Sequence, residues 1–257
     1  MSTDELQVED RDAVRIITLN RPARRNALTV QSVATLARVV EAAPDEGIRA
    51  LVLTGAGDHF CAGADAETAL HVTQQAERPE VAHRLLTQFH APVLAIWNSE
   101  LPVIAAVAGV AYGGGCNLAL LCDLVYATPD ARFCEVFLRR GLVPDLGGTW
   151  LLPRIVGMQR AKQLAFLTEE ISGTRACELG LVNAVLPDAN AALAQAVETA
   201  TRLAQAPATA VALTKRLFNA GGGLSFEAAL KLEAVIQADL LRTPGAQQGF
   251  GGFLKKD

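Results

Sequence analysis

Hydrophobic residues in the first half of the chain form continuous apolar runs, and segments with helical spacing lie between them. These runs predict strands at 13–22, 48–55, 103–109, 123–128 and 131–137. Residues 28–43 carry apolar side chains at helical spacing, which predicts a helix with Thr29 as its N-terminal cap. A second helix is expected to end at Pro92. Strands that alternate with helices indicate an α/β core.

From about residue 148 the pattern changes to one helix after another. Helices are expected at 149–157, 159–168, 174–180, 190–206, 208–219 and 225–242. Only residues 181–187 interrupt this series, as a short strand. We therefore expect an α/β core over residues 1–190 and a C-terminal helical region over 191–257, which packs on the core or on a neighbouring subunit.

Composition allows a large core and argues against two kinds of partner. Hydrophobic residues make up 51% of the 257 positions and charged residues 19%. The net charge is −4 and no long basic run occurs, so nucleic acid is not favoured. Residues 101–122 are uncharged and long enough to span a bilayer, but Glu100 and Asp123 flank them and glycines interrupt them. A buried strand, a turn and a buried helix explain this stretch better than a membrane segment.

The cysteines and the N-terminal segment indicate a cytoplasmic protein. The cysteines are Cys61, Cys116, Cys122, Cys134 and Cys177. Their number is odd, no CxxC motif occurs and only four histidines are present, so buried reduced thiols are expected rather than disulfides or a zinc site. The acidic, polar start of the chain is unlike a signal or transit peptide.

Three consecutive glycines, at 113–115, follow a buried strand and precede a helix expected over 117–122. Glycine lets a ligand approach the main chain, and the free N–H groups at a helix start attract negative charge. A second strand and glycine-rich turn occur at 53–67. Gly55-x-Gly57 lacks the third glycine of a dinucleotide-binding motif. One such loop alone can be a close backbone crossing, whereas two favour a pair of amides aimed at one oxyanion.

Five ordered stretches resemble the crotonase superfamily, also called the enoyl-CoA hydratase/isomerase family, in its isomerase-like branch. They are NRPARRNALT (20–29), GAGDHFCAGAD (55–65), GVAYGGGCNLALLCD (109–123), GLVPDLGGTWLLPRIVG (141–157) and ACELGLVNAVLP (176–187). The resemblance extends from about residue 8 to 255. It implies an α/β fold of the crotonase (ClpP-like) type, a spiral of ββα units with a C-terminal helical region.

The resemblance also implies an acyl-CoA thioester as substrate, with no separate cofactor and no metal. The backbone N–H groups of Ala64 and Gly114 would hold the thioester oxygen as it becomes an enolate. Coenzyme A would be bound by Arg24 and by the backbone around Ala62 and Asp65. Phe253 and Lys256 resemble a terminal Phe and Lys that a neighbouring subunit contributes, which implies a homotrimer or hexamer. For Arg24 and Lys256 the alternative is a solvated surface cation.

The catalytic acids of this chain differ from those of the family's hydratases, which use two glutamates. Asn117 and Phe137 occupy those two positions and are expected in the acyl pocket. Glu135 lies two residues too early, which displaces its carboxylate by about 6–7 Å along a strand. Asp145 remains, at a position where the family's double-bond isomerases place their working Asp. Its alternative role is to cap the following helix.

The sequence therefore favours a double-bond isomerase that converts a 3-enoyl-CoA into a 2-enoyl-CoA, with Asp145 as the single acid/base. A hydratase with atypical acids, an Asp-nucleophile hydrolase or dehalogenase, and a non-catalytic acyl-CoA-binding protein remain alternatives. Asn117 can orient the thioester or cap its own helix. His90 is expected to be a packed or surface residue rather than a catalytic one.

Overall fold

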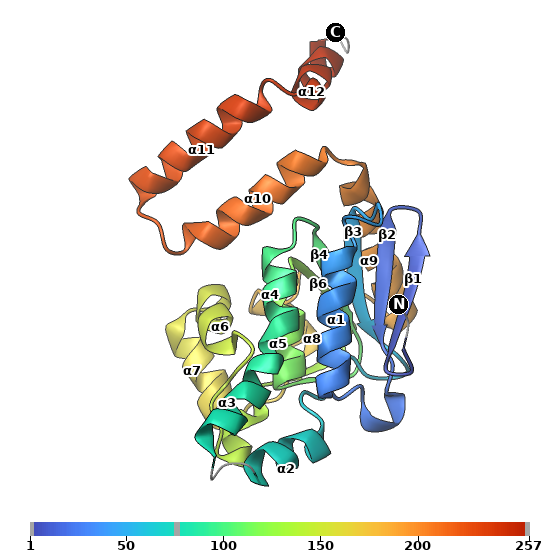
Figure 1. Cartoon of the computed structure of the whole chain (residues 1–257), viewed down its shortest axis with the longest axis vertical. Coiled ribbons are helices and arrows are strands. Elements are labelled where there is room, and N and C mark those ends of the chain that lie inside the picture. Colours follow the sequence, from blue (N-terminus) through green and yellow to red (C-terminus); the bar gives the residue numbers. More distant parts are fainter. Residues whose placement is uncertain (1–2, 75–77, 255–257) are drawn as a thin grey trace.

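The computed structural model describes residues 3–74 and 78–254 (Figure 1). The strands are β1 (Leu6–Arg11), β2 (Val14–Leu19), β3 (Ala50–Gly55), β4 (Val103–Val107), β5 (Val110–Tyr112), β6 (Leu124–Ala127), β7 (Arg132–Cys134), β8 (Ile171–Ser172) and β9 (Ala184–Val185). The α-helices are α1 (Val30–Ala42), α2 (Ala66–Gln74), α3 (Pro79–Gln88), α4 (His90–Asn98), α5 (Gly114–Leu121), α6 (Gly148–Val156), α7 (Met158–Leu167), α8 (Gly173–Glu178), α9 (Ala189–Gln205), α10 (Ala208–Gly221), α11 (Phe226–Leu240) and α12 (Pro244–Leu254). The 3₁₀-helices are η1 (Pro22–Arg24) and η2 (Val136–Arg140).

The described strands form two sheets, and the chain passes between them several times after β4. The larger sheet has the order β1-β2-β3-β4-β6-β9 and is parallel except for the β1–β2 pair. The smaller sheet has the order β5-β7-β8. The chain passes from β4 to β5 and from β6 to β7, from the larger sheet into the smaller one, and α5 follows β5. This is the ββα spiral that the sequence predicts.

Helix α1 begins where its cap residue predicts. The hydroxyl of Thr29 accepts a hydrogen bond from the backbone N–H of Ser32, and the Ser32 hydroxyl accepts one from Thr29 N–H. This reciprocal pair satisfies two N–H groups that a helix start leaves unpaired. Helix α1 then packs along α4 on one side of the larger sheet (Figure 1).

The core also includes α9, which the sequence assigned to the C-terminal region. Ala196 and Ala200 of α9 are fully buried against Ile16 and Val52 of the sheet. Small side chains let the helix lie close to the strands. Helix α9 is thus the part of the expected C-terminal region that packs on the core, and the chain leaves the core only after α9.

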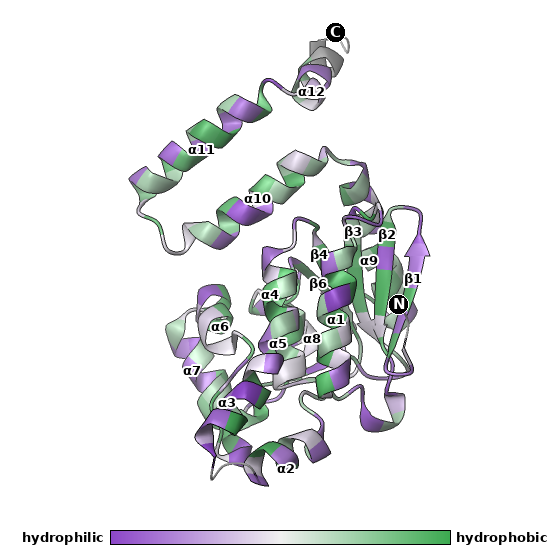
Figure 2. Cartoon of the chain, in the orientation of Figure 1, coloured by the Kyte–Doolittle hydropathy of each residue, from purple (hydrophilic) through white to green (hydrophobic). Residues whose placement is uncertain are grey.

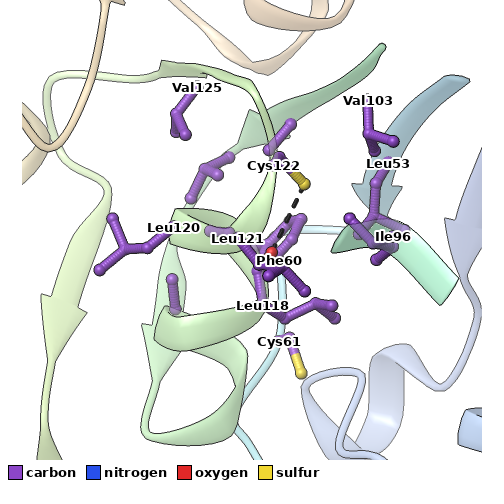
Figure 3. Packing of buried hydrophobic residues seen from close by; sticks show 14 of the residues in the cluster. Leu53, Phe60, Cys61, Ile96, Val103, Leu118, Leu120, Leu121, Cys122 and Val125 are labelled. Atoms are coloured by element: carbon purple, nitrogen blue, oxygen red, sulfur yellow. Dashed lines mark hydrogen bonds between the residues drawn. The ribbon is translucent and has the colours of Figure 1, made fainter. Parts of the chain in front are cut away.

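Two expectations need correction. Pro92 does not end a helix but lies in the first turn of α4, where a missing N–H leaves no helical hydrogen bond unmade. Helix α5 starts at Gly114 rather than near Asn117, so Gly114 and Gly115 are its first residues. Figure 3 shows Leu118 and Leu121 of α5 among buried side chains. The Cys122 thiol donates a hydrogen bond to the Leu118 carbonyl.

Helices α10, α11 and α12 extend away from the body of the chain (orange to red in Figure 1). Lys215 anchors α10: its buried ammonium donates to the carbonyls of Ile96 and Leu101, both at 3.0 Å, and pairs with Asp123 at 2.8 Å. Large apolar side chains remain exposed on these helices and in the turns between them, at Phe218, Leu224, Phe226, Leu230, Leu232, Val235, Leu241 and Phe250. Figure 2 shows hydrophobic positions in green along α10 and α11. Within the described ranges, no helix is long and apolar enough to cross a membrane.

Candidate active site

Two backbone amides lie side by side where the glycine-rich loops meet. The hydrogen bonds Leu28 N–H to Gly63 O and Asp65 N–H to Leu28 O, both 2.8 Å, hold the first loop on either side of Ala64. The N–H groups of Ala64 and Gly114 have no acceptor within residues 3–74 and 78–254. A Cβ on Gly63 would lie 3.3 Å from the nitrogen of Gly114, so the two loops are in contact. These are the two amides that the resemblance implies as donors to the thioester oxygen.

A side chain at each of the three glycines would meet a different obstacle. Gly113 has φ +52°, a left-handed conformation that side chains disfavour. A Cβ on Gly114 would approach Leu146 to 2.9 Å, and one on Gly115 would overlap the carbonyl of Cys61. Gly114 is the first residue of α5, and it lines the cavity that lies beside this turn.

That cavity has a volume of about 180 Å³. Its lining consists of Ala62, Gly63, Ala64, Thr68, Ala69, Val72, Thr73, Leu86, Phe89, Gly113, Gly114, Val136, Phe137, Arg140, Leu142, Asp145 and Leu146. Asp145 is the one carboxylate and Arg140 the one cation among these described residues. The rest of the wall is mostly apolar, which suits an acyl chain.

Asp145 lines the cavity and is exposed there. The side chain does not cap α6, whose N-terminal cap is Gly147 without a side-chain hydrogen bond. Partial desolvation by the surrounding groups raises the pKa of the Asp145 carboxyl, and the charge of nearby His90 opposes that shift. A carboxylate with a raised pKa is a better proton acceptor near neutral pH.

Asn117 has a different place from the one the sequence suggests. It is fully buried, does not line the cavity and does not cap α5, so its assignment to the acyl pocket is wrong; Phe137 does line the cavity. The Asn117 amide donates to the backbone carbonyl of Asp145 at 2.9 Å and to the Glu135 carboxyl at 3.5 Å. Helix α6 packs directly on it, since a Cβ on Gly148 would overlap the amide. Asn117 thus holds the turn that carries Asp145.

Glu135 lies behind Asn117 and outside the cavity lining. Burial raises the pKa of its carboxyl to about 7; hydrogen bonds from Cys116 and Asn117 oppose the shift, and the charge of Asp145 adds to it. One Glu135 oxygen and the Asn117 side-chain oxygen are buried without a hydrogen-bond partner among the described residues. Protonation removes the charge from this incompletely hydrogen-bonded buried carboxylate, in agreement with the raised pKa.

Within the described part of the chain, the residues expected to bind coenzyme A make no hydrogen bond with Asn117 or Glu135. Arg24 is exposed and contacts Glu67 at 3.2 Å, while Ala62 lines the cavity. Asp65 is buried, accepts from Arg21 at 3.0 Å and accepts from N–H groups in the first turn of α2. Phe253 belongs to α12. Lys256 lies outside the described residues.

Sequence reasoning missed the roles of Asn117 and Arg140 because no local pattern marks them. The contact between Asn117 and Asp145 joins residues 28 positions apart. Arg140 belongs to a stretch expected to follow a strand, and only the fold turns η2 toward the cavity.

Comparison with known proteins agrees with this geometry. The family model described as enoyl-CoA hydratase/isomerase matches residues 9–257. The chain is 38% identical over 256 residues to a probable enoyl-CoA hydratase of Rhodobacter capsulatus, across 100% of this chain and 97% of that protein. It is 36% identical over 244 residues to the 1,2-epoxyphenylacetyl-CoA isomerase of Escherichia coli, with coverage of 95% and 92%. The crystal structure of an enoyl-CoA hydratase/isomerase from Cupriavidus metallidurans is similar with a TM-score of 0.92 and 38% identity, across 100% of this chain and 96% of that chain.

Proposed function

Since the chain belongs to the enoyl-CoA hydratase/isomerase family, we propose that it moves the double bond of a 3-enoyl-CoA into conjugation with the thioester. Asp145 is the single acid/base of this reaction. One observation carries the proposal: Asp145 is the one carboxylate on the wall of the described cavity, and the amides of Ala64 and Gly114 lie on the same wall.

The reaction is a proton shift along three carbons. Asp145 takes a proton from C2 of the substrate, and the electron pair moves through the carbonyl onto the thioester oxygen. The N–H groups of Ala64 and Gly114 stabilise that negative charge; one such donor typically contributes about 3 kcal/mol. Asp145 then returns the proton at C4, which leaves the double bond between C2 and C3. No water is consumed.

Water addition is less well supported by the cavity. The resemblance implies that hydratases of the family have glutamates at positions 117 and 137. Asn117 and Phe137 stand there in this chain, and neither side chain can exchange a proton. Glu135 is buried behind Asn117 and does not reach the cavity wall. The relative from Escherichia coli is named an isomerase of an epoxyphenylacetyl-CoA, so isomerisation of an acyl-CoA thioester is represented among the similar proteins.

We also propose that the protein assembles as a homotrimer or a hexamer of two trimers. The exposed apolar side chains of α10, α11 and α12 support this, because such residues are rarely left in water over so long an extension. In such an assembly, the C-terminal Phe253 and Lys256 would reach the coenzyme A of a neighbouring subunit.

Incubation with 3-enoyl-CoA and with 2-enoyl-CoA in D₂O, followed by mass spectrometry, tests the reaction. An isomerase shifts the double bond and incorporates deuterium at C2 or C4 without a gain of water. Addition of water to 2-enoyl-CoA would instead show that the protein is a hydratase. Neither exchange nor addition would favour a non-catalytic acyl-CoA-binding protein.

A further inference from the structure

We propose that the preferred substrate carries a second carboxylate at the far end of its acyl chain, and that Arg140 binds it. This names the substrate class of the site described above and therefore rests on the proposed function. Two neighbouring arginines at the end of η2, Arg139 and Arg140, have different surroundings.

Arg139 has a structural role, because its guanidinium binds a neighbouring loop residue. Its guanidinium donates to the hydroxyl of Thr168 at 2.9 Å and to the carbonyl of the same residue at 2.6 Å. Arg140 instead lines the cavity, and within residues 3–74 and 78–254 its guanidinium makes no hydrogen bond and no ion pair. One arginine thus serves the structure, and the next offers its donors to the cavity.

Apolar side chains make up most of the cavity lining around Arg140. The cavity wall beyond it is aliphatic or aromatic, with Leu86, Phe89 and Leu142 among the lining residues. Arg140 is exposed where it lines the cavity, and a purely hydrocarbon acyl chain gains nothing from contact with its guanidinium. Asp145 does not neutralise it, since no ion pair joins the two. A planar guanidinium binds a carboxylate through two parallel hydrogen bonds.

Its position suits the distal end of the chain rather than the thioester. Phe137 touches the oxyanion turn, 3.5 Å from where a Cβ on Gly113 would lie. Residues three apart in a 3₁₀-helix lie on one face and about 6 Å apart along the axis. Arg140 is three residues after Phe137 in η2, so it lies one turn further along that face. We therefore place Arg140 about one 3₁₀ turn beyond Phe137 along the acyl chain, away from the oxyanion turn.

Binding of saturated thioesters tests this inference without any turnover. Adipoyl-CoA and hexanoyl-CoA have the same chain length and the same coenzyme A, and they differ in the distal carboxylate. Calorimetry should show that the wild-type protein binds adipoyl-CoA more tightly by about ten- to a hundredfold, the range of a charge-assisted hydrogen-bonded pair. Equal affinity for the two ligands would overturn the proposal.

Arg140→Met and Arg140→Lys separate this role from others. Arg140→Met should remove the preference for adipoyl-CoA and leave hexanoyl-CoA binding within about twofold, and Arg140→Lys should retain part of the preference because it keeps the charge. Arg202→Met, an exposed arginine of α9, is the matched control and should change neither affinity. Equal losses for both ligands in Arg140→Met would show that Arg140 contacts a phosphate of coenzyme A instead, against the proposal.

Turnover distinguishes this inference from the proposed function. The rates with 3-hexenedioyl-CoA and 3-hexenoyl-CoA should differ mainly in KM. If adipoyl-CoA binds preferentially but neither enoyl-CoA is isomerised, the carboxylate site stands and the isomerase assignment fails. If both are isomerised with equal KM, the isomerase stands and Arg140 is not its carboxylate site.

Discussion

Replacing Glu135 with glutamine should change how the stability of the protein depends on pH. The Glu135 carboxyl is 3% exposed, and its pKa is raised from 4.5 to about 7, first of all by burial. Glutamine has almost the same shape, stays neutral at every pH and can donate a hydrogen bond to a neighbouring acceptor. The substitution therefore removes the titration and keeps the packing.

The sign follows from where the proton is held more tightly. Because the folded-state pKa is the higher one, the folded protein binds more protons than the unfolded chain between pH 4.5 and 7. The free energy of unfolding therefore decreases as the pH rises through this window and levels off above it. At about 1.4 kcal/mol per pKa unit, the loss between pH 5 and pH 8 amounts to about 2–3 kcal/mol. Glu135→Gln lacks this loss and should gain on the wild type by that amount.

Urea unfolding at pH 5, 6, 7 and 8, at one fixed protein concentration, measures the effect. The difference between the two proteins cancels the titration of every other group that is unchanged. Glu198→Gln, at an exposed position of α9, controls for the removal of one carboxylate and should run parallel to the wild type. If the Glu135→Gln and wild-type curves also stay parallel within about 0.5 kcal/mol, Glu135 is not a buried, proton-binding group and the reasoning is refuted.

The remaining predictions concern the catalytic turn and the assembly. Asp145→Asn should lower isomerisation by about 10²- to 10⁴-fold with little change in the binding of a saturated acyl-CoA, and undiminished activity would refute Asp145 as the base. Asn117→Ala should lower the free energy of unfolding by about 1–3 kcal/mol and reduce kcat more than it changes KM, because the Asp145 carbonyl loses its buried donor; an unchanged kcat would deny that Asn117 positions the turn. Sedimentation at micromolar concentration should show three or six protomers, and a stable monomer would count against the assembly. Truncation after Gly245 should weaken coenzyme A binding, and unchanged affinity would remove Phe253 and Lys256 from that site.

The sequence by itself determined the features that depend on neighbours along the chain. The apolar runs at β3 and β4 predict buried parallel strands, because strands covered on both faces need apolar side chains throughout. The cap of α1 follows from Thr29, whose hydroxyl acts only three residues away. The turn at 113–115 follows from consecutive glycines after a strand, since close backbone approach disfavours a Cβ within the turn itself.

Only the tertiary structure decided what lies behind and beyond that site. Asn117 meets Glu135 and Asp145 across 18 and 28 residues, so no local spacing indicates that an amide supports the catalytic turn. The raised pKa of Glu135 comes first of all from burial, and the position of this residue in the sequence does not reveal that it is buried. Helix α9 has the composition of the helices after it, yet it packs on the sheet while they extend away, because Ala196 and Ala200 meet strands that lie far earlier in the chain.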